Sequence, residues 1–155
     1  LFLKSSKSYG NEENPNKLPE LENMYPLNLA LCPSCQKEMF DVSSRRYYYP
    51  FSSCSCCGGN HSFLLSYPYE RQNTSFKFLI PCENCKKEQV NSGFKEKHEI
   101  NSCHDCGVPV RLVNKTRERY ANDSGSFRTM FEVAAKAIND NKKVLIKTTF
   151  GYRVF

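Results

Sequence analysis

Tryptophan is absent from this 155-residue chain, and hydrophobic residues make up only 39% of it. Together with a mean hydropathy of −0.61, this composition predicts modest cores and leaves room for one ordinary domain or two small ones. No apolar run approaches the ~20 residues that a membrane-spanning helix needs, so we expect a soluble protein with no membrane partner. Glu38, Asp41 and Glu88 have no spacing that predicts a carboxylate pair for general acid–base chemistry, and no catalytic residue is predicted.

Cysteine, by contrast, is abundant and regularly spaced. Eight of the nine cysteines form four Cys-x-x-Cys pairs, namely Cys32/Cys35, Cys54/Cys57, Cys82/Cys85 and Cys103/Cys106. Each pair offers two thiolates about one turn apart, and two pairs complete the tetrahedral sulfur shell that structural zinc prefers. We therefore predict two structural zinc ions with these eight cysteines as ligands.

The pairs belong to an internal duplication. The run CPSCQKE at 32–38 is repeated as CENCKKE at 82–88, and corresponding cysteines lie 50 residues apart in the first pair and 49 in the second. Eighteen residues separate the pairs of the first copy, seventeen those of the second, and twenty-four separate the copies. Pairing within each copy is the simplest arrangement, while spacing alone leaves cross-brace and nested pairings open.

A disulfide framework in a secreted protein is the alternative use of such cysteines. The odd cysteine count, the lack of a signal-peptide pattern in the opening residues and the short spacing within each pair favour zinc. Thiolates reserved for zinc imply a reducing compartment, so we expect a cytoplasmic protein. Cys56 is the leftover thiol and is expected to be a spectator. Gly58 and Gly107 each follow a second pair, where a positive φ would turn backbone N–H groups toward sulfur.

The formal net charge of +6 is a weak indication of a nucleic-acid partner. Each Zn(Cys)4 site carries a charge of −2, so two sites lower the net charge of the loaded protein from +6 to +2. A zinc ribbon that binds single-stranded nucleic acid is the alternative function, because the aromatic run at 47–49 and nearby basic residues suit stacking and phosphate contact. A redox or zinc-buffering role is a third hypothesis.

The expected fold is a small, irregular, metal-nucleated α+β structure. Two tandem zinc-finger or knuckle-like units, at about 30–60 and 80–110, form a region from 26 to 113. A helix and a strand at 114–155 then begin an incomplete α/β domain. We expect short helices at 36–41 and after an N-cap at 73–75, and strands at 63–67 and 108–113. Ser126 is predicted to cap a helix. The apolar face of this helix consists of Phe127, Met130, Phe131, Ala134, Ala137 and Ile138. The run at 139–141 ends that helix, and a strand starts at 144.

These motifs resemble the zinc-finger region of the HypF family, the carbamoyltransferases of NiFe-hydrogenase maturation. The resemblance rests on the cysteine pairs, on RRYYYPF at 45–51 and on YPYERQNTS at 67–75, and it is strongest over 26–110. It implies that 1–25 hold the end of an acylphosphatase-like domain and a linker. It also implies that 114–155 hold a linker and the first helix and strand of a YrdC-like nucleotide-binding domain.

The resemblance further implies a chemistry for a full-length parent enzyme. That enzyme would use carbamoyl phosphate and ATP to make a carbamoyl adenylate and pass the carbamoyl group to a HypE-like acceptor, toward the cyanide ligands of the hydrogenase iron. Lys147 matches a lysine of the family's nucleotide site, although the glycine-rich motif after it is reduced to Gly151. We expect this chain alone to catalyse nothing. The expected partners are flanking domains of the parent chain, a HypE-like acceptor and another copy of the chain through its C-terminal segment, and not nucleic acid.

The remaining polar residues are expected to be structural. Arg45 and Arg46 could grip a phosphate or an acidic partner, but we expect them to brace the tyrosine run through cation–π or carboxylate contacts, and Arg71 to act similarly. Since each site already has four thiolates, His98 is not expected to be a zinc ligand. His61 and His104 are expected to face solvent.

Overall fold

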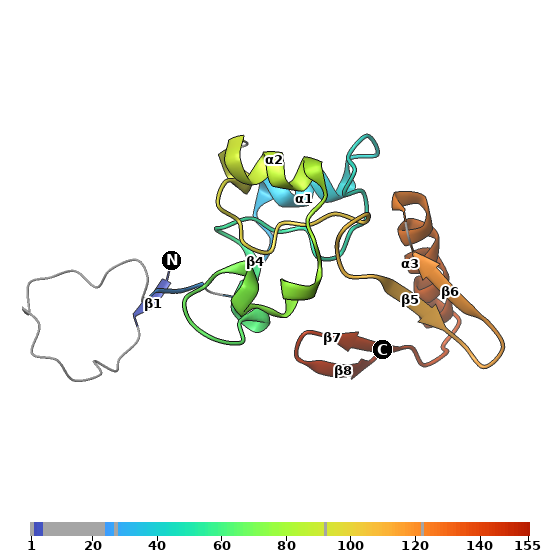
Figure 1. The fold of residues 1–155 in the computed structure, drawn as a ribbon. Coiled ribbons are helices and arrows are strands. Elements are labelled where there is room, and N and C mark those ends of the chain that lie inside the picture. Colours follow the sequence, from blue (N-terminus) through green and yellow to red (C-terminus); the bar gives the residue numbers. More distant parts are fainter. Residues whose placement is uncertain (1, 5–23, 27, 92, 122) are drawn as a thin grey trace, which may run out of the picture.

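The computed structural model describes residues 2–4, 24–26, 28–91, 93–121 and 123–155. The chain forms short helices, 3-10 turns and four two-stranded antiparallel sheets within these residues, as Figure 1 shows. The strands are β1 (Phe2–Lys4), β2 (Met24–Pro26), β3 (Asn28–Leu29), β4 (Gly58–Gly59), β5 (Val110–Val113), β6 (Glu118–Ala121), β7 (Leu145–Thr148) and β8 (Gly151–Val154). The helices are α1 (Pro33–Phe40), α2 (Glu83–Asn91) and α3 (Ser124–Asn139). The 3-10 turns are η2 (Asn60–Phe63), η3 (Arg71–Asn73), η4 (Ser75–Phe78) and η5 (Gly93–Lys95). These elements confirm the small α+β class.

Helices α1 and α2 each begin directly after the first cysteine of their unit and carry the second one. The predicted short helix at 36–41 is confirmed, but it begins at Pro33, because proline at the first helical position has a favourable φ and needs no N–H partner. Cys32 is the N-cap of α1, and Cys35 lies buried in its first turn. Glu83 places a negative charge in the first turn of α2, where it complements the helix dipole.

The segment between the two units is made of turns. The strand predicted at 63–67 is wrong, since η2 reaches Phe63 and only Leu64 forms a bridge, with Thr74. The predicted cap at 73–75 is confirmed, because the Thr74 side chain accepts a hydrogen bond from the amide of Phe76. Phe76 is buried, whereas Phe78 remains 80% exposed. A 3-10 turn of four residues can direct only part of its apolar set inward.

The C-terminal part contains more strands than the sequence predicts. The predicted strands at 108–113 and from 144 correspond to β5 and β7, each of which is paired in a hairpin, with β6 and β8 respectively. The helix end at 139–141 is confirmed, with Asn141 at φ 57. The cap of α3 differs from the prediction, since Asp123 is the N-cap and accepts a hydrogen bond from the Ser126 amide at 2.8 Å.

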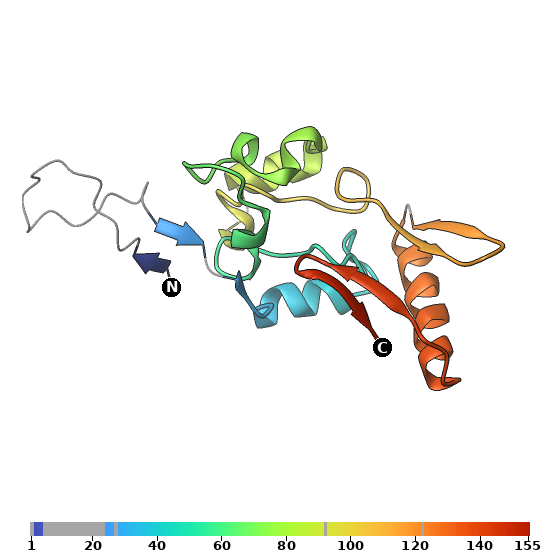
Figure 2. The same ribbon diagram turned by 90° about the horizontal axis from the view of Figure 1, so that it is seen from below.

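One small core joins the finger region to the C-terminal part. Tyr49, Ala121, Phe127 and Met130 are buried together. The Tyr49 and Phe127 rings meet edge to face at 5.8 Å. The apolar stripe predicted on α3 therefore packs partly against the finger region, and Figure 2 shows α3 beside the β5–β6 hairpin. None of the helices in the described ranges is long and apolar enough to cross a membrane.

The domain boundaries at 1–25, 26–113 and 114–155 stay predictions. Most of 1–25 lies outside the described residues. Its described residues include β1, which pairs with β2 and places Phe2 opposite Pro26. The Tyr49 core contains residues from both sides of the boundary predicted at 113–114.

Candidate metal centres

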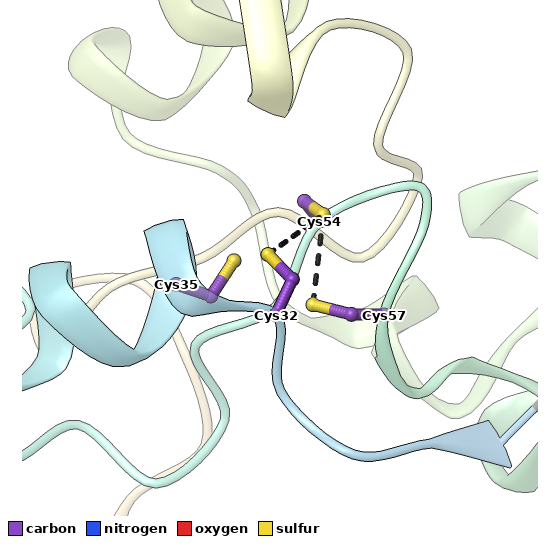
Figure 3. Close-up of side chains that lie close together, drawn as sticks. All are labelled: Cys32, Cys35, Cys54 and Cys57. Atoms are coloured by element: carbon purple, nitrogen blue, oxygen red, sulfur yellow. Dashed lines mark hydrogen bonds between the residues drawn. The ribbon is translucent and has the colours of Figure 1, made fainter.

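The first cluster consists of Cys32, Cys35, Cys54 and Cys57, as Figure 3 shows. The first two come from the start of α1, and the last two flank a tight turn in which the Cys57 amide donates to the Cys54 carbonyl at 3.3 Å. The Sγ atoms of Cys32 and Cys54 lie 3.9 Å apart, and those of Cys54 and Cys57 lie 3.5 Å apart. Three of the four cysteines are buried.

The second cluster repeats this arrangement with Cys82, Cys85, Cys103 and Cys106. The Sγ atom of Cys103 lies 3.9 Å from that of Cys82 and 3.9 Å from that of Cys106, and Cys106 lies 3.6 Å from Cys85. In both clusters all four Sγ atoms lie within 4.8 Å of one another. Pairing within each copy is therefore confirmed for the clusters.

The spacing of the sulfurs fits zinc. A tetrahedral site with Zn–S bonds of about 2.3 Å has sulfurs about 3.8 Å apart. The observed distances of 3.5 to 3.9 Å bracket this value. Four soft sulfur donors with no open position are the donor set of a structural rather than a catalytic zinc site. Both clusters could thus hold a structural zinc ion.

The close spacing of the thiols in each cluster favours a bound cation. Burial raises the pKa of Cys54 to about 11 and also raises the pKa of Cys35. In the second cluster the hydrogen bond between Cys103 and Cys106 raises the pKa of Cys103 to about 11 and lowers that of Cys106. In the first cluster, burial is outweighed by hydrogen bonds from neighbouring groups, which lower the pKa of Cys32 to about 7. Four thiolates at such close range are unfavourable without a counter-charge, which a divalent metal supplies.

Three basic side chains donate hydrogen bonds to the sulfurs. The ammonium of Lys95 lies 3.6 Å from the Sγ of Cys35. The guanidinium of Arg45 lies 3.1 Å from the Sγ of Cys85, and that of Arg46 lies 3.6 Å from the same sulfur. Such N–H···S contacts stabilise thiolates and fix their direction, as outer-shell partners of metal ligands do.

Arg46 brings two carboxylates together that the sequence did not pair. Its guanidinium, 1% exposed, forms ion pairs with Glu38 on α1 and Glu88 on α2. Sequence spacing did not predict this approach of Glu38 and Glu88, because it arises where the fold places both helices around one buried cation. Burial alone would raise the pKa of Glu88, but hydrogen bonds from Arg46 and Asn101 hold it at about 2. Both groups thus serve as charge partners.

Arg71 also makes internal contacts. Its guanidinium donates to the carbonyl oxygens of Leu79, Glu99 and Asn101 at 2.7 to 3.0 Å. It also lies 5.7 Å from the ring centroid of Phe76. These contacts, with those of Arg45 and Arg46, agree with the expected structural role, although the two adjacent arginines bind carboxylates and sulfurs rather than tyrosine rings.

The two glycines after the second pairs have different roles. Gly58 has φ +86, as predicted, and an added Cβ would lie 2.5 Å from the Cβ of Ser53. Gly107 does not have positive φ, so the prediction is wrong there. Close approach explains this glycine, because a Cβ would lie 1.8 Å from the hydroxyl oxygen of Tyr49.

The histidines and Cys56 lie outside both clusters. His98 is buried, and its Nε2 atom forms a 2.9 Å hydrogen bond with the Ser53 hydroxyl. His61 is exposed, as expected, but the His104 side chain is only 13% exposed, so the expectation that it faces solvent is wrong. Cys56 is exposed. Its amide donates to the Sγ of Cys54 at 3.4 Å, so the backbone of Cys56 contacts a predicted zinc ligand although its thiol lies outside the cluster.

Lys147 lies on β7, far along the sequence from the clusters. Its side chain is exposed, and its ammonium lies 6.0 Å from the ring centroid of Tyr152. Neither this contact nor the surrounding hairpin tests nucleotide binding, which stays a prediction for this residue.

The comparison with protein families gives a match in the first unit. Residues 31–64 match the family model described as the HypF finger. These residues are therefore similar to the HypF finger family. The matched segment contains the whole first cluster and the helix that carries Cys35, whereas the second cluster lies outside it.

Curated relatives extend this result. The chain is 39% identical over 61 residues to the probable carbamoyltransferase HypF of Methanocaldococcus jannaschii, which is 39% of this chain and 8% of the relative. It is 34% identical over 84 residues to the carbamoyltransferase HypF of Rhodobacter capsulatus, which is 54% of this chain and 11% of the relative.

Two crystal structures share the fold. HypF from T. kodakarensis matches with a TM-score of 0.72 and 30% identity over 84% of this chain and 16% of its own length. Full-length HypF in its phosphate- and nucleotide-bound form matches with a TM-score of 0.65 and 28% identity over 82% of this chain and 16% of its own length. The chain thus spans 8% to 16% of the length of the four relatives described here, and the comparisons support a HypF fragment.

Proposed function

We propose that this chain is the zinc-stabilised docking region of a HypF-like carbamoyltransferase, and that it orients the flanking catalytic parts of that enzyme. The observation that carries the proposal is the pair of closed four-sulfur clusters within the segment similar to HypF. A closed sulfur shell stabilises a fold and leaves no position for substrate. The carbamoyl chemistry would therefore belong to other parts of the enzyme.

The apolar surface supports a docking role. A groove of about 1450 Å³ is lined by the finger region, β5, α3 and the β7–β8 hairpin. Leu145, Tyr152 and Val154 on that hairpin are each at least 63% exposed. Apolar surface of this kind normally contacts another part of a protein. In the proposal, flanking domains of the parent chain cover it.

The parent enzyme would use carbamoyl phosphate and ATP and would transfer the carbamoyl group to a HypE-like acceptor, toward the cyanide ligands of hydrogenase. This part rests on the similarity to carbamoyltransferases named HypF. The alternative of nucleic-acid binding receives less support, because Arg46 and Tyr49 are buried and unavailable to stack on a base or contact a phosphate.

Native mass spectrometry with metal analysis, under reducing conditions, tests the structural part. We expect two zinc ions per chain, whereas a folded, fully reduced chain without bound metal would overturn the proposal. Steady-state assays with carbamoyl phosphate and ATP test the division of labour. We expect no phosphate release from this chain alone, and turnover by it would contradict the proposed role.

A further inference from the structure

The two units have the same backbone path between their cysteine pairs. The amide of Tyr48 donates to the carbonyl of Met39 at 2.8 Å, and the amide of Lys97 donates to that of Gln89 at 3.0 Å. Tyr48 and Lys97 have φ of 57 and 54, which few residues other than glycine adopt. These residues are therefore equivalent, with the 49-residue offset that also relates Cys54 to Cys103.

The same offset makes Arg46 equivalent to Lys95. The amide of Tyr49 donates to the Arg46 carbonyl at 2.9 Å, and the amide of His98 donates to the Lys95 carbonyl at 3.2 Å. Both residues are 1% exposed. Buried cations at one repeated position point to a role that both units share.

The contacts of these two cations are exchanged between the units. Arg46 belongs to the first unit and pairs there with Glu38, yet it also binds Glu88 and the Sγ of Cys85 in the second. Lys95 belongs to the second unit, yet it binds Glu38 at 2.9 Å and the Sγ of Cys35 at 3.6 Å in the first. The targets are themselves equivalent, since Cys35 and Glu38 correspond to Cys85 and Glu88 by the 50-residue repeat.

Backbone and hydroxyl contacts follow the same exchange. The Arg46 Nε atom donates to the Ser102 carbonyl at 2.8 Å, and the Lys95 Nζ atom donates to the Ser53 carbonyl at 2.6 Å. Tyr49 and the Ser102 hydroxyl lie 3.0 Å apart, and His98 and the Ser53 hydroxyl lie 2.9 Å apart. Such reciprocal contacts are typical of a two-fold symmetric dimer. Here the two related units belong to one chain.

The exchange has an electrostatic consequence. A zinc ion with four thiolates carries a charge of −2, and in each site part of that charge faces a buried cation supplied by the other unit. Loss of Arg46 leaves Arg45 as the cation beside Glu88 and the Sγ of Cys85, and loss of Lys95 leaves Arg46 as the cation beside Glu38. Either loss reduces the charge compensation at the opposite cluster. The loop that carries each cation lies between the two cysteine pairs of its own unit, so its own metal site fixes where that cation points.

We propose that Arg46 and Lys95 are positioning residues that couple the two metal sites, each holding the zinc site of the opposite unit. This inference rests on the proposed zinc binding. Zinc at one cluster orders the loop whose cation stabilises the other cluster, so loss of that cation weakens zinc binding first at the opposite cluster. Neither unit is complete without its counterpart.

Substitution of each cation by methionine in the full chain tests the coupling. Zinc-loaded Arg46→Met and Lys95→Met are mixed with a chelator and a thiol-alkylating reagent, and peptide mass spectrometry follows each cysteine separately. We expect a crossed pattern. Arg46→Met accelerates labelling of Cys82 and Cys103 by about 10- to 100-fold, and Lys95→Met does the same for Cys32 and Cys54, as expected for the loss of an outer-shell partner.

Controls separate this coupling from general loss of structure. Lys86→Met removes a cation from α2 whose side chain is 51% exposed, and it should leave every labelling rate unchanged. Cys56 is exposed and should label rapidly in all variants, as an internal reference. Should a methionine variant fail to fold, Arg46→Lys and Lys95→Arg keep the charge, and a smaller crossed acceleration is expected from each.

Faster labelling confined to the unit that carries the substitution, or equal acceleration of both clusters, would overturn the coupling. These outcomes leave the proposed function intact if the unmodified chain still binds two zinc ions. Absence of zinc from the unmodified chain would instead overturn the proposed function itself, so the two failures are distinguishable.

Discussion

Gly107 lies directly against the side chain of Tyr49. The Tyr49 hydroxyl accepts a hydrogen bond from the amide of Val108 at 3.1 Å, and a Cβ on Gly107 would lie 1.8 Å from that hydroxyl oxygen. The cysteine turn of the second unit is thereby held against an aromatic residue of the first unit, which also packs on α3.

Gly107→Ala is therefore expected to lower the free energy of unfolding by about 1–3 kcal/mol, the usual effect of forcing extra volume into a packed site. Urea denaturation of the zinc-loaded protein measures this change. Gly59→Ala is the matched control, because its added Cβ would meet no atom closer than 3.8 Å. Equal stability of the two variants would contradict the close approach at Gly107.

Tyr49→Phe removes one buried hydroxyl and leaves the ring in place. The Val108 amide and the Ser102 hydroxyl then lose a partner, and an unsatisfied buried polar group costs about 1–3 kcal/mol. Tyr47→Phe is the comparison, since the Tyr47 hydroxyl contacts Arg128 in an exposed position at 3.3 Å, and a change within about 0.5 kcal/mol is expected. Thermal denaturation with zinc present measures both, and a neutral Tyr49→Phe would refute the role of the hydroxyl.

Phe127→Ala tests the attachment of α3 to the finger region. Phe127 is 0% exposed in the shared core, and truncation of a buried phenylalanine costs about 3–5 kcal/mol. Phe150, which is 69% exposed, provides the control, because its replacement by alanine should change stability by less than about 0.5 kcal/mol. Urea titrations followed by tyrosine fluorescence distinguish the two. Similar midpoints for both variants would mean that the core does not hold the helix.

Removal of zinc is expected to unfold the finger region. Structural zinc contributes on the order of 10 kcal/mol of coupled folding and binding free energy, comparable with the whole stability of an ordinary domain. The described hydrophobic clusters are small. Near-ultraviolet circular dichroism after complete chelation, with reductant present, should lose its tyrosine signal and recover it on addition of two equivalents of zinc. Retention of the full signal by metal-free protein would show that the fold does not depend on the metal.

The cysteine spacing predicted the two clusters correctly because a Cys-x-x-Cys pair is a local structure. Three residues of separation place two sulfurs on one side of a turn, and this geometry needs little from the rest of the chain. The end of α3 was predictable for the same reason, since asparagine acts on its own backbone. The expectation of a positive φ at Gly107 failed because glycine is needed there for the close approach of the Tyr49 hydroxyl, and Tyr49 lies 58 residues earlier in the sequence.

The sequence by itself determined the residues that can bind metal, the duplication that relates them and the similarity to HypF. Only the tertiary structure decided that the two units exchange their buried cations, so that Arg46 serves the second cluster and Lys95 the first. The physical reason is that charge compensation acts through space. A cation reaches the nearest buried anion in the folded chain, and the distance along the sequence does not say which one that is.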